Sequence, residues 1–190
     1  MDLVWGRGPN LFLEAELLDM DPQGRALDLA CGEGRNAIWL ARRGWKVTAV
    51  DFSEVAVEKG RLLAVDSRVE VEWIVADVTR WPAPEEAFAL AVVLYLQVSA
   101  EDRRSVVDSA VSALAPGGKL LMIGHARRNL DDGVGGPLDP ELLWEPRELA
   151  AEVAAAGAVV TFSEERSRRV DSESGSSFAI DTVLESRRIR

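Results

Sequence analysis

Residues 25–52 read RALDLACGEGRNAIWLARRGWKVTAVDF. Two short apolar runs in this stretch enclose a glycine-containing loop and a segment whose apolar residues recur with helical spacing. Gly32 and Gly34 lie in the loop, where glycine lets a ligand approach the backbone closely. Asp51 comes directly after the second apolar run. The stretch therefore predicts a strand, a loop, a helix and a second strand, an arrangement with which parallel sheets bind nucleosides.

Length and composition limit the classes of function. A chain of 190 residues is expected to form a single domain over residues 1–190, and 47% hydrophobic residues suffice for an ordinary core. The formal charge of −10 gives no electrostatic basis for binding nucleic acid or an anionic membrane. The single cysteine, Cys31, can form neither an internal disulfide nor a cysteine metal site. Without a membrane-spanning run or a signal-peptide pattern, we expect the cytosol, and the sequence leaves the oligomeric state open.

The rest of the chain alternates between strand-like and amphipathic segments. We expect an N-terminal arm and helix within residues 1–24, five strand–helix units, a substrate-side loop over 125–145, a further helix and a closing antiparallel hairpin. This order predicts an α/β fold, a Rossmann-like, doubly wound sheet of seven strands that is mostly parallel. The expected strands span residues 26–30, 47–50, 69–75, 88–96, 119–124, 158–168 and 177–187, and the expected helices 11–20, 36–43, 54–65, 100–114 and 146–156.

Three finer expectations concern local structure. Asn10, Ser53 and Ser99 can cap the helices that follow them. The helix over 54–65 is expected to bury Val55, Leu62 and Leu63 on its apolar face. The polar residues 171–177 are expected to form the turn of the closing hairpin.

The positions of three acids distinguish between nucleoside ligands. Residues 32–37 match a dinucleotide fingerprint with alanine in its last place, and Asp51 would then bind the ribose. However, Asp28 lies in the first strand, where its charge would repel a pyrophosphate but suit a cationic amine. Asp77 follows the third strand, where it could accept a hydrogen bond from an adenine amino group. S-adenosylmethionine carries an amine, a ribose diol and an adenine, and so matches all three acids.

The glycine loop also resembles a known family. Residues 28–34, Asp-Leu-Ala-Cys-Gly-Glu-Gly, are similar to the acid-x-Gly-x-Gly-x-Gly motif of class I S-adenosylmethionine-dependent methyltransferases, with Ala30 in place of the first glycine. The order of elements and the closing hairpin extend this resemblance over nearly the whole chain. The loop and the helix after it further resemble the small-molecule branch that contains tellurite-resistance and thiopurine-type methyltransferases. The resemblance implies S-adenosylmethionine as cofactor, S-adenosylhomocysteine as product, a small-molecule acceptor and no metal.

The resemblance also implies roles for individual residues. The loop would hold the methionine end, Asp51 the ribose hydroxyls, and Phe52 would lie against the adenine. Asp77 would bind the adenine amino group, and Leu94 or Tyr95 would line the face where the methyl group is transferred. The implied cofactor-binding residues are Asp28, Ala30, Gly32, Gly34, Asp51, Phe52, Asp77, Val78, Leu94 and Tyr95.

Fewer signals describe the acceptor side. His125, the only histidine, ends the fifth predicted strand, and its ordinary pKa of about 6.5 suits either a general base or a structural role. Arg127 and Arg168 could bind an anionic acceptor or lie on solvated edges. Trp5 and Arg7 could cover the cofactor or belong to a loose terminus.

Two alternatives to a small-molecule methyltransferase stay open. A nicotinamide-dependent oxidoreductase would use the same loop, although Asp28 argues against it. A non-catalytic subunit could bind the cofactor on the same fold without turnover. After the fourth strand, residues 94–97 lack the Asn/Asp-Pro-Pro-aromatic motif, which argues against methylation of adenine or of glutamine amides.

Overall fold

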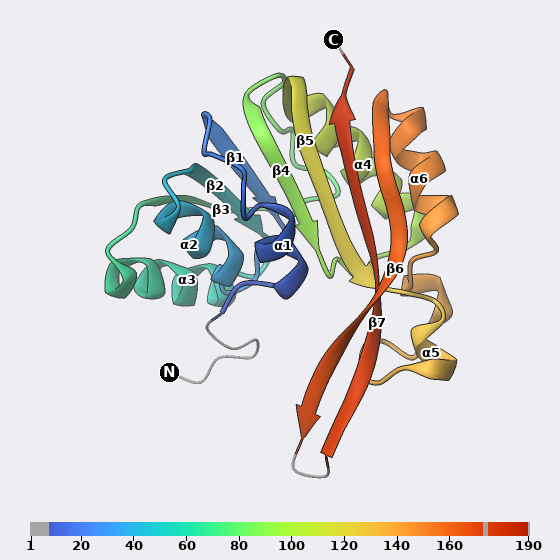
Figure 1. Ribbon diagram of the computed structural model, residues 1–190. Helices are drawn as coiled ribbons and strands as arrows, with labels where there is room; N and C mark the ends of the chain where they lie inside the picture. The colour runs from blue at the N-terminus through green and yellow to red at the C-terminus, as the bar shows by residue number, and fades with distance from the viewer. Residues whose placement is uncertain (1–7, 173–174, 190) are drawn as a thin grey trace.

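The computed structural model describes residues 8–172 and 175–189. Their strands form one seven-stranded sheet in the order β3-β2-β1-β4-β5-β7-β6 (Figure 1). Neighbouring strands among β1 to β5 run parallel to one another, whereas β7 runs antiparallel to both β5 and β6. The predicted fold class is therefore confirmed. The strands are β1 Arg25–Leu29, β2 Lys46–Asp51, β3 Val71–Val75, β4 Phe88–Leu94, β5 Leu114–His125, β6 Ala158–Ser172 and β7 Gly175–Arg188.

Helices cover both faces of the sheet (Figure 1). One core cluster joins α1 and α2 to one face, and a second joins α4 and α6 to the other. Because both faces are covered, the central strand β4 is buried along nearly its whole length. None of the helices in the described part of the chain has the length and apolar character to cross a membrane. The helices are α1 Leu11–Glu16, α2 Arg35–Arg42, α3 Glu54–Ser67, α4 Ala100–Ala113, α5 Asn129–Asp132, the 3₁₀ helix η1 Pro140–Leu142 and α6 Pro146–Ala155.

The local capping signals are confirmed. The Asn10 side chain accepts hydrogen bonds from the first-turn N–H groups of α1, and Ser53 and Ser99 do the same for α3 and α4. Gly44, with φ of 97°, follows the end of α2 in the left-handed conformation that glycine adopts at low cost. These short-range contacts fix where the helices begin and end.

The expected count of five strand–helix units is wrong at its third unit, although the expected helix ranges already leave residues 76–87 without a helix. Residues 76–87, between β3 and β4, form no helix. Pro82 and Pro84 lack the N–H groups that a helix needs and restrict the residues before them. Val78, Trp81 and other apolar side chains of this segment pack instead on the core cluster beneath α4.

Several predicted boundaries also differ from the structure. α1 ends four residues early, at Glu16. β5 starts at Leu114, which pairs with Phe88 ahead of a register shift between β4 and β5. The strands of the closing hairpin extend into residues 171–177, where the turn is expected, because the β6–β7 pairing continues to Ser172 and Gly175. This end of the hairpin projects beyond the body of the sheet (Figure 1), so polar side chains can occupy paired strands.

The segment after β5 is more ordered than a loop. It holds α5 and η1, and Trp144 returns to the sheet, where its N–H donates to the His125 carbonyl at 2.9 Å. The Trp144 side chain is fully buried and lies against Gly124, where an added Cβ would come within 2.7 Å of the ring. The C-terminal part of the segment after β5 therefore belongs to the core.

Trp73 of β3 determines how α2 and α3 pack. The expected apolar face of α3 is wrong for Val55 and Leu62, which are 70% and 51% exposed, whereas Leu63 is half-buried. The small residues Gly60 and Ala64 face inward instead, and a Cβ on Gly60 would lie 2.6 Å from the Trp73 ring. The same ring fills the space beside Gly34, where a Cβ would approach to 2.2 Å. Glycine is therefore required at both positions for packing.

This packing predicts a difference between two glycine substitutions. Gly34 and Gly117 have φ of 78° and 80°, so alanine at either position carries a similar backbone cost of about 1 kcal/mol. Only Gly34→Ala also overpacks the Trp73 ring, since nothing lies within 4 Å of a Cβ on Gly117. Urea denaturation should show that Gly34→Ala lowers the free energy of unfolding by about 1–3 kcal/mol more than Gly117→Ala. Equal losses would show that Trp73 does not constrain the loop.

Candidate functional site

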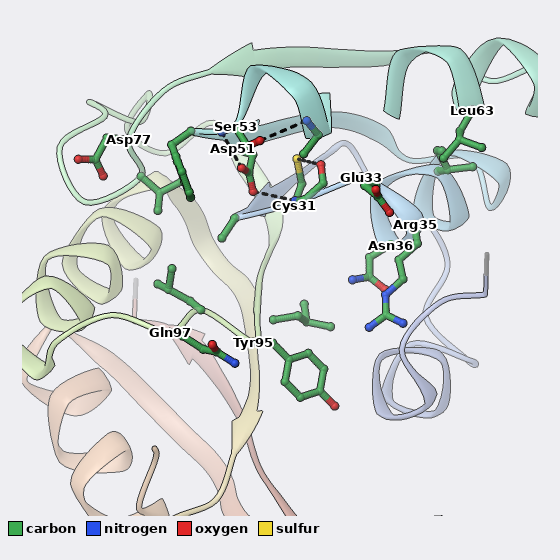
Figure 2. Close-up of a pocket in the computed structure, with 18 of the residues that line it drawn as sticks. Cys31, Glu33, Arg35, Asn36, Asp51, Ser53, Leu63, Asp77, Tyr95 and Gln97 are labelled. Carbon is green, nitrogen blue, oxygen red and sulfur yellow. Dashed lines mark hydrogen bonds between the residues drawn. The ribbon is translucent and has the colours of Figure 1, made fainter. Parts of the chain in front are cut away.

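A cavity of about 600 Å³ opens where β1, β2 and β4 end (Figure 2). The carboxyl ends of parallel strands meet at this edge, where open α/β sheets bind their ligands. Asp28 and Gly34 are not among the lining residues. The other predicted cofactor residues all line the cavity: Ala30, Gly32, Asp51, Phe52, Asp77, Val78, Leu94 and Tyr95.

Asp51 holds the glycine loop in place. Its carboxylate is buried and accepts hydrogen bonds from the Gly32 N–H at 2.8 Å and the Ser53 N–H at 2.9 Å (Figure 2). Each carboxylate oxygen can accept more than one hydrogen bond, so ribose hydroxyls can bind in addition. Within the same loop, Ala30 has φ of 60°, the conformation that glycine would adopt with less strain. The loop is therefore shaped by hydrogen bonds as well as by its glycines.

One carboxyl oxygen of Asp28 lacks a hydrogen-bond donor. The carboxyl group is fully buried in β1, and one oxygen accepts the Ala37 N–H. Within the described chain, its Oδ2 has no hydrogen-bond partner. Burial and the nearby Asp51 charge together raise the pKa of Asp28 to about 7. An unpaired buried carboxylate oxygen fits the ammonium group of a methionine moiety, so the residues present suit the implied cofactor.

Asp77 and Phe52 lie at the rim of the cavity. Asp77 Oδ1 accepts hydrogen bonds from the Thr79 N–H and hydroxyl, which lower the pKa of this exposed carboxyl group. Through these bonds Asp77 caps the turn after β3, and its Oδ2 is left to accept a hydrogen bond from a ligand. Phe52 is 77% exposed at the cavity, so a flat ring could stack on it.

Asp181 of β7 is the centre of a buried cluster next to Tyr95; Tyr95 lines the cavity, whereas Asp181, Arg168 and His125 do not. Asp181 is fully buried, and its Oδ2 accepts hydrogen bonds from the Tyr95 hydroxyl at 2.9 Å and from Arg168 Nε at 2.7 Å. His125 Nδ1 lies 3.1 Å from its other oxygen. Burial, followed by the Asp181 charge, raises the pKa of Tyr95 to about 12, so the phenol stays protonated and donates at neutral pH. Sequence reasoning missed Asp181; the one signal was a lone acid among the apolar residues 179–184.

The predicted acceptor-side residues are only partly brought together. Arg168 joins the Asp181 cluster, and the ring of His125 lies 4.9 Å from that of Tyr95, although His125 itself does not line the cavity. Arg127 lies elsewhere, paired with Glu148 at 3.1 Å. Trp5 and Arg7 lie outside the described residues.

Two further contacts connect the N-terminal helix to the cavity. The Asn10 N–H donates to Asn36 Oδ1 at 2.9 Å, and the Asn10 side-chain amide donates to the Tyr95 hydroxyl at 3.1 Å. Asn36 lines the cavity next to Arg35, and neither residue was among those predicted to bind the cofactor. The cap of α1 is thus part of the structure around the site.

Comparison with known proteins finds methyltransferases. Residues 26–118, just under half of the chain, match the family model described as a methyltransferase domain. The fold is that of a class I S-adenosylmethionine-dependent methyltransferase. TehB from Haemophilus influenzae shares it, with a TM-score of 0.76, 18% identity, and coverage of 94% of this chain and 62% of TehB.

Curated relatives match a shorter region. A demethylmenaquinone methyltransferase from Clavibacter sepedonicus is 36% identical over 99 residues, which are 52% of this chain and 40% of the relative. A ubiquinone biosynthesis O-methyltransferase from Xanthomonas axonopodis pv. citri is 31% identical over 105 residues, which are 54% of this chain and 44% of the relative. The chain therefore matches less than half the length of these relatives.

The raised pKa of Asp28 predicts how stability changes with pH. Between the unfolded pKa of 3.8 and the folded pKa of about 7, the unfolded chain loses this proton while the folded protein keeps it. The free energy of unfolding therefore falls as pH rises through this window, by at most about 1.4 kcal/mol per pH unit. Asp28→Asn has no such proton, so its stability relative to wild type should rise from pH 4 to pH 7 and then level off. Parallel stability profiles in chemical denaturation would contradict the assignment.

Proposed function

We propose that this protein is an S-adenosylmethionine-dependent methyltransferase that acts on a small-molecule acceptor in the cytosol. The observation that carries the proposal is the glycine loop, which Asp51 fixes at the strand ends beside a cavity of about 600 Å³. The methyltransferase domain over residues 26–118 supports the reaction class. The relatives' names refer to demethylmenaquinone and to ubiquinone biosynthesis, which supports a small acceptor.

Most of the proposed binding roles fall on residues that line the cavity, whereas Asp28 and Gly34 lie outside its lining. Asp51 accepts hydrogen bonds from the ribose hydroxyls, while Phe52 and Val78 contact the adenine and Asp77 accepts from its amino group. The glycine loop, with Ala30, Gly32 and Gly34, surrounds the methionine moiety, and the unpaired Oδ2 of Asp28 receives its ammonium group. Leu94 and Tyr95 separate this moiety from the acceptor.

Methyl transfer requires the protein mainly to align the acceptor with the methyl group of the cofactor. The bound cofactor supplies a methyl group on a positively charged sulfur, ready for in-line displacement. The chain's own residues orient the acceptor on the opposite side of that methyl group and exclude water. A protic methyl acceptor also loses a proton. That His125 takes up this proton stays a prediction. The ring of His125 lies 4.9 Å from the ring of Tyr95.

Two alternatives make different predictions about ligands and turnover. The nicotinamide-dependent oxidoreductase is not favoured by the methyltransferase relatives. It predicts that NAD binds and that S-adenosylhomocysteine does not. A non-catalytic subunit would bind S-adenosylhomocysteine but release none in a screen of oxygen, nitrogen, sulfur and metalloid-anion acceptors. Calorimetric titration with both ligands, followed by that screen, separates the three functions.

The ribose assignment predicts the effect of a single substitution. Asp51→Ala leaves the ribose hydroxyls unpaired and should weaken S-adenosylhomocysteine binding by about 1–3 kcal/mol in a calorimetric titration. Asp108→Ala, on the exposed side of α4, is a matched control that should bind like wild type. Thermal unfolding of both variants would show whether the loss is one of stability, since Asp51 also holds Gly32 and Ser53. Unchanged affinity in Asp51→Ala would show that the ribose binds elsewhere.

A further inference from the structure

Tyr95 connects the cavity to a buried carboxylate. It follows β4 and lines the cavity, and in Figure 2 its ring lies across the cavity from Asp51. Its hydroxyl donates to Asp181 Oδ2 at 2.9 Å. Asp181 is fully buried and lies outside the lining of the cavity. A proton that moves from a bound ligand to the Tyr95 oxygen can therefore continue to a carboxylate that the ligand itself does not touch.

Further contacts hold Tyr95 in one position. Its backbone has φ of 56°, a strained conformation for a residue other than glycine, and strain of this kind gathers at functional sites. The Tyr95 N–H donates to the Ile123 carbonyl at 2.7 Å, and the hydroxyl accepts from the Asn10 side-chain amide at 3.1 Å. Asn10 is buried, and its Oδ1 accepts from N–H groups in the first turn of α1, so its amide nitrogen is fixed beside Tyr95. The Tyr95 hydroxyl is therefore held between a hydrogen-bond donor and a carboxylate that accepts its proton.

The lining of the cavity favours an acceptor that binds without charge. After β4, Tyr95 lies among the apolar side chains of Leu94, Leu96 and Val98, which suit a flat aromatic acceptor. The described lining also contains more acids than arginines, so it would repel a negatively charged acceptor. The acids are Glu33, Asp51, Asp66 and Asp77, and the arginines are Arg35 and Arg42. An acceptor hydroxyl is therefore expected to bind with its proton, which has to leave as the methyl group is transferred.

The acids of the lining have other roles. Glu33 pairs with a lysine of α3 at 2.8 Å, Asp51 accepts from the glycine loop, and Asp77 accepts from the turn after β3. Asp66 lies in the last turn of α3, roughly 18 Å along the helix from the strand ends. These acids therefore leave the proton of an acceptor beside Tyr95 to another group.

We propose that Tyr95 takes the proton of a neutral aromatic hydroxyl acceptor and passes its own proton to Asp181. The inference rests on the proposed function and specifies its acceptor class and the path of the proton. The acceptor oxygen bonds to the methyl carbon while the carbon–sulfur bond breaks, and the sulfur keeps the electron pair of that bond. The acceptor's proton moves to the Tyr95 oxygen, and the Tyr95 proton moves to Asp181 Oδ2, which leaves a neutral carboxyl group.

The surroundings of Tyr95 support this transfer. The Tyr95 oxygen can accept a second hydrogen bond, from the acceptor hydroxyl, beside the one from Asn10. Burial raises the pKa of Tyr95, and the positive charge of Arg168 opposes this effect, so Arg168 stabilises negative charge that develops on the phenol oxygen during transfer. Asp181 and Asn10 act through Tyr95 and are positioning residues. His125 lies outside the lining and reaches the acceptor only through this cluster.

Two phenols of different acidity test the proton path. Release of S-adenosylhomocysteine would be measured with 4-methylphenol, which binds protonated, and with 4-nitrophenol, which is largely ionised in neutral solution and needs no base. Tyr95→Phe should slow methylation of 4-methylphenol by about a hundredfold or more and that of 4-nitrophenol by less than about tenfold. A purely structural loss would slow both phenols equally, and that result overturns the proposal. Methylation of neither phenol by a wild-type protein that binds S-adenosylhomocysteine also overturns it, whereas failure to bind S-adenosylhomocysteine means that the proposed function fails instead.

Asp181→Asn tests the second step of the transfer. Asparagine keeps the shape of the side chain and an oxygen for the Tyr95 hydroxyl, but it does not take up the proton. The variant should show the same selective loss on 4-methylphenol and bind S-adenosylhomocysteine within about twofold of wild type. Asp171→Asn, an exposed acid on β6 paired with Arg169, is a matched control that should methylate both phenols at wild-type rates. Equal rates of Asp181→Asn and Asp171→Asn on 4-methylphenol contradict the proton path.

Asn10→Asp is a second variant that does not disturb the pairing of Asp181 with Arg168. Aspartate still caps α1, but its carboxylate cannot donate to the Tyr95 oxygen and competes with Asp181 for the Tyr95 proton. Methylation of 4-methylphenol should fall by about tenfold or more while that of 4-nitrophenol stays within about twofold of wild type. Thermal unfolding would confirm that the cap is intact. Equal effects on the two phenols, or no effect on either, contradict the proposed position of Tyr95.

Discussion

The carboxylate of Asp51 holds together the two segments that form the site, the glycine loop and the start of α3. By accepting the Gly32 and Ser53 N–H groups, it joins the loop after β1 to the start of α3 at the end of β2. The Trp73 ring fixes the same region from below, because it packs against Gly34 and Gly60. Together these contacts fix the glycine loop relative to α2 and α3, and this arrangement forms the cavity at the strand ends. A glycine loop alone would be too flexible to define it.

The cluster around Asp181 is built by tertiary contacts between distant segments. Tyr95 comes from the end of β4, Arg168 from β6 and Asp181 from β7, and a single buried carboxylate joins them. The closing hairpin is therefore more than an edge of the sheet, since it supplies two of the charged groups of the cluster. Asn10 connects α1 to Tyr95 as well, which couples the N-terminal helix to the cavity.

Local chemistry explains which features could be predicted from the sequence. The caps at Asn10, Ser53 and Ser99, and the positions of Asp51 and Asp77 at or just after strand ends, depend on residues near each other in the chain. The inward face of α3 depends on Trp73, and the hairpin turn on the distance its strands extend beyond the sheet. Asp181 collects partners up to 86 residues away, so sequence spacing carries no signal for the cluster. Long-range packing thus decided what the local patterns could not.

A crystal structure of the protein bound to S-adenosylhomocysteine would test the central claim most directly, because it would locate each part of the ligand. The account predicts that both ribose hydroxyls lie within hydrogen-bonding distance of Asp51 while its bonds to Gly32 and Ser53 persist. The adenine should lie between Phe52 and Val78, and the sulfur should face Tyr95. A ligand bound outside this cavity, or a ribose that does not contact Asp51, would contradict the account.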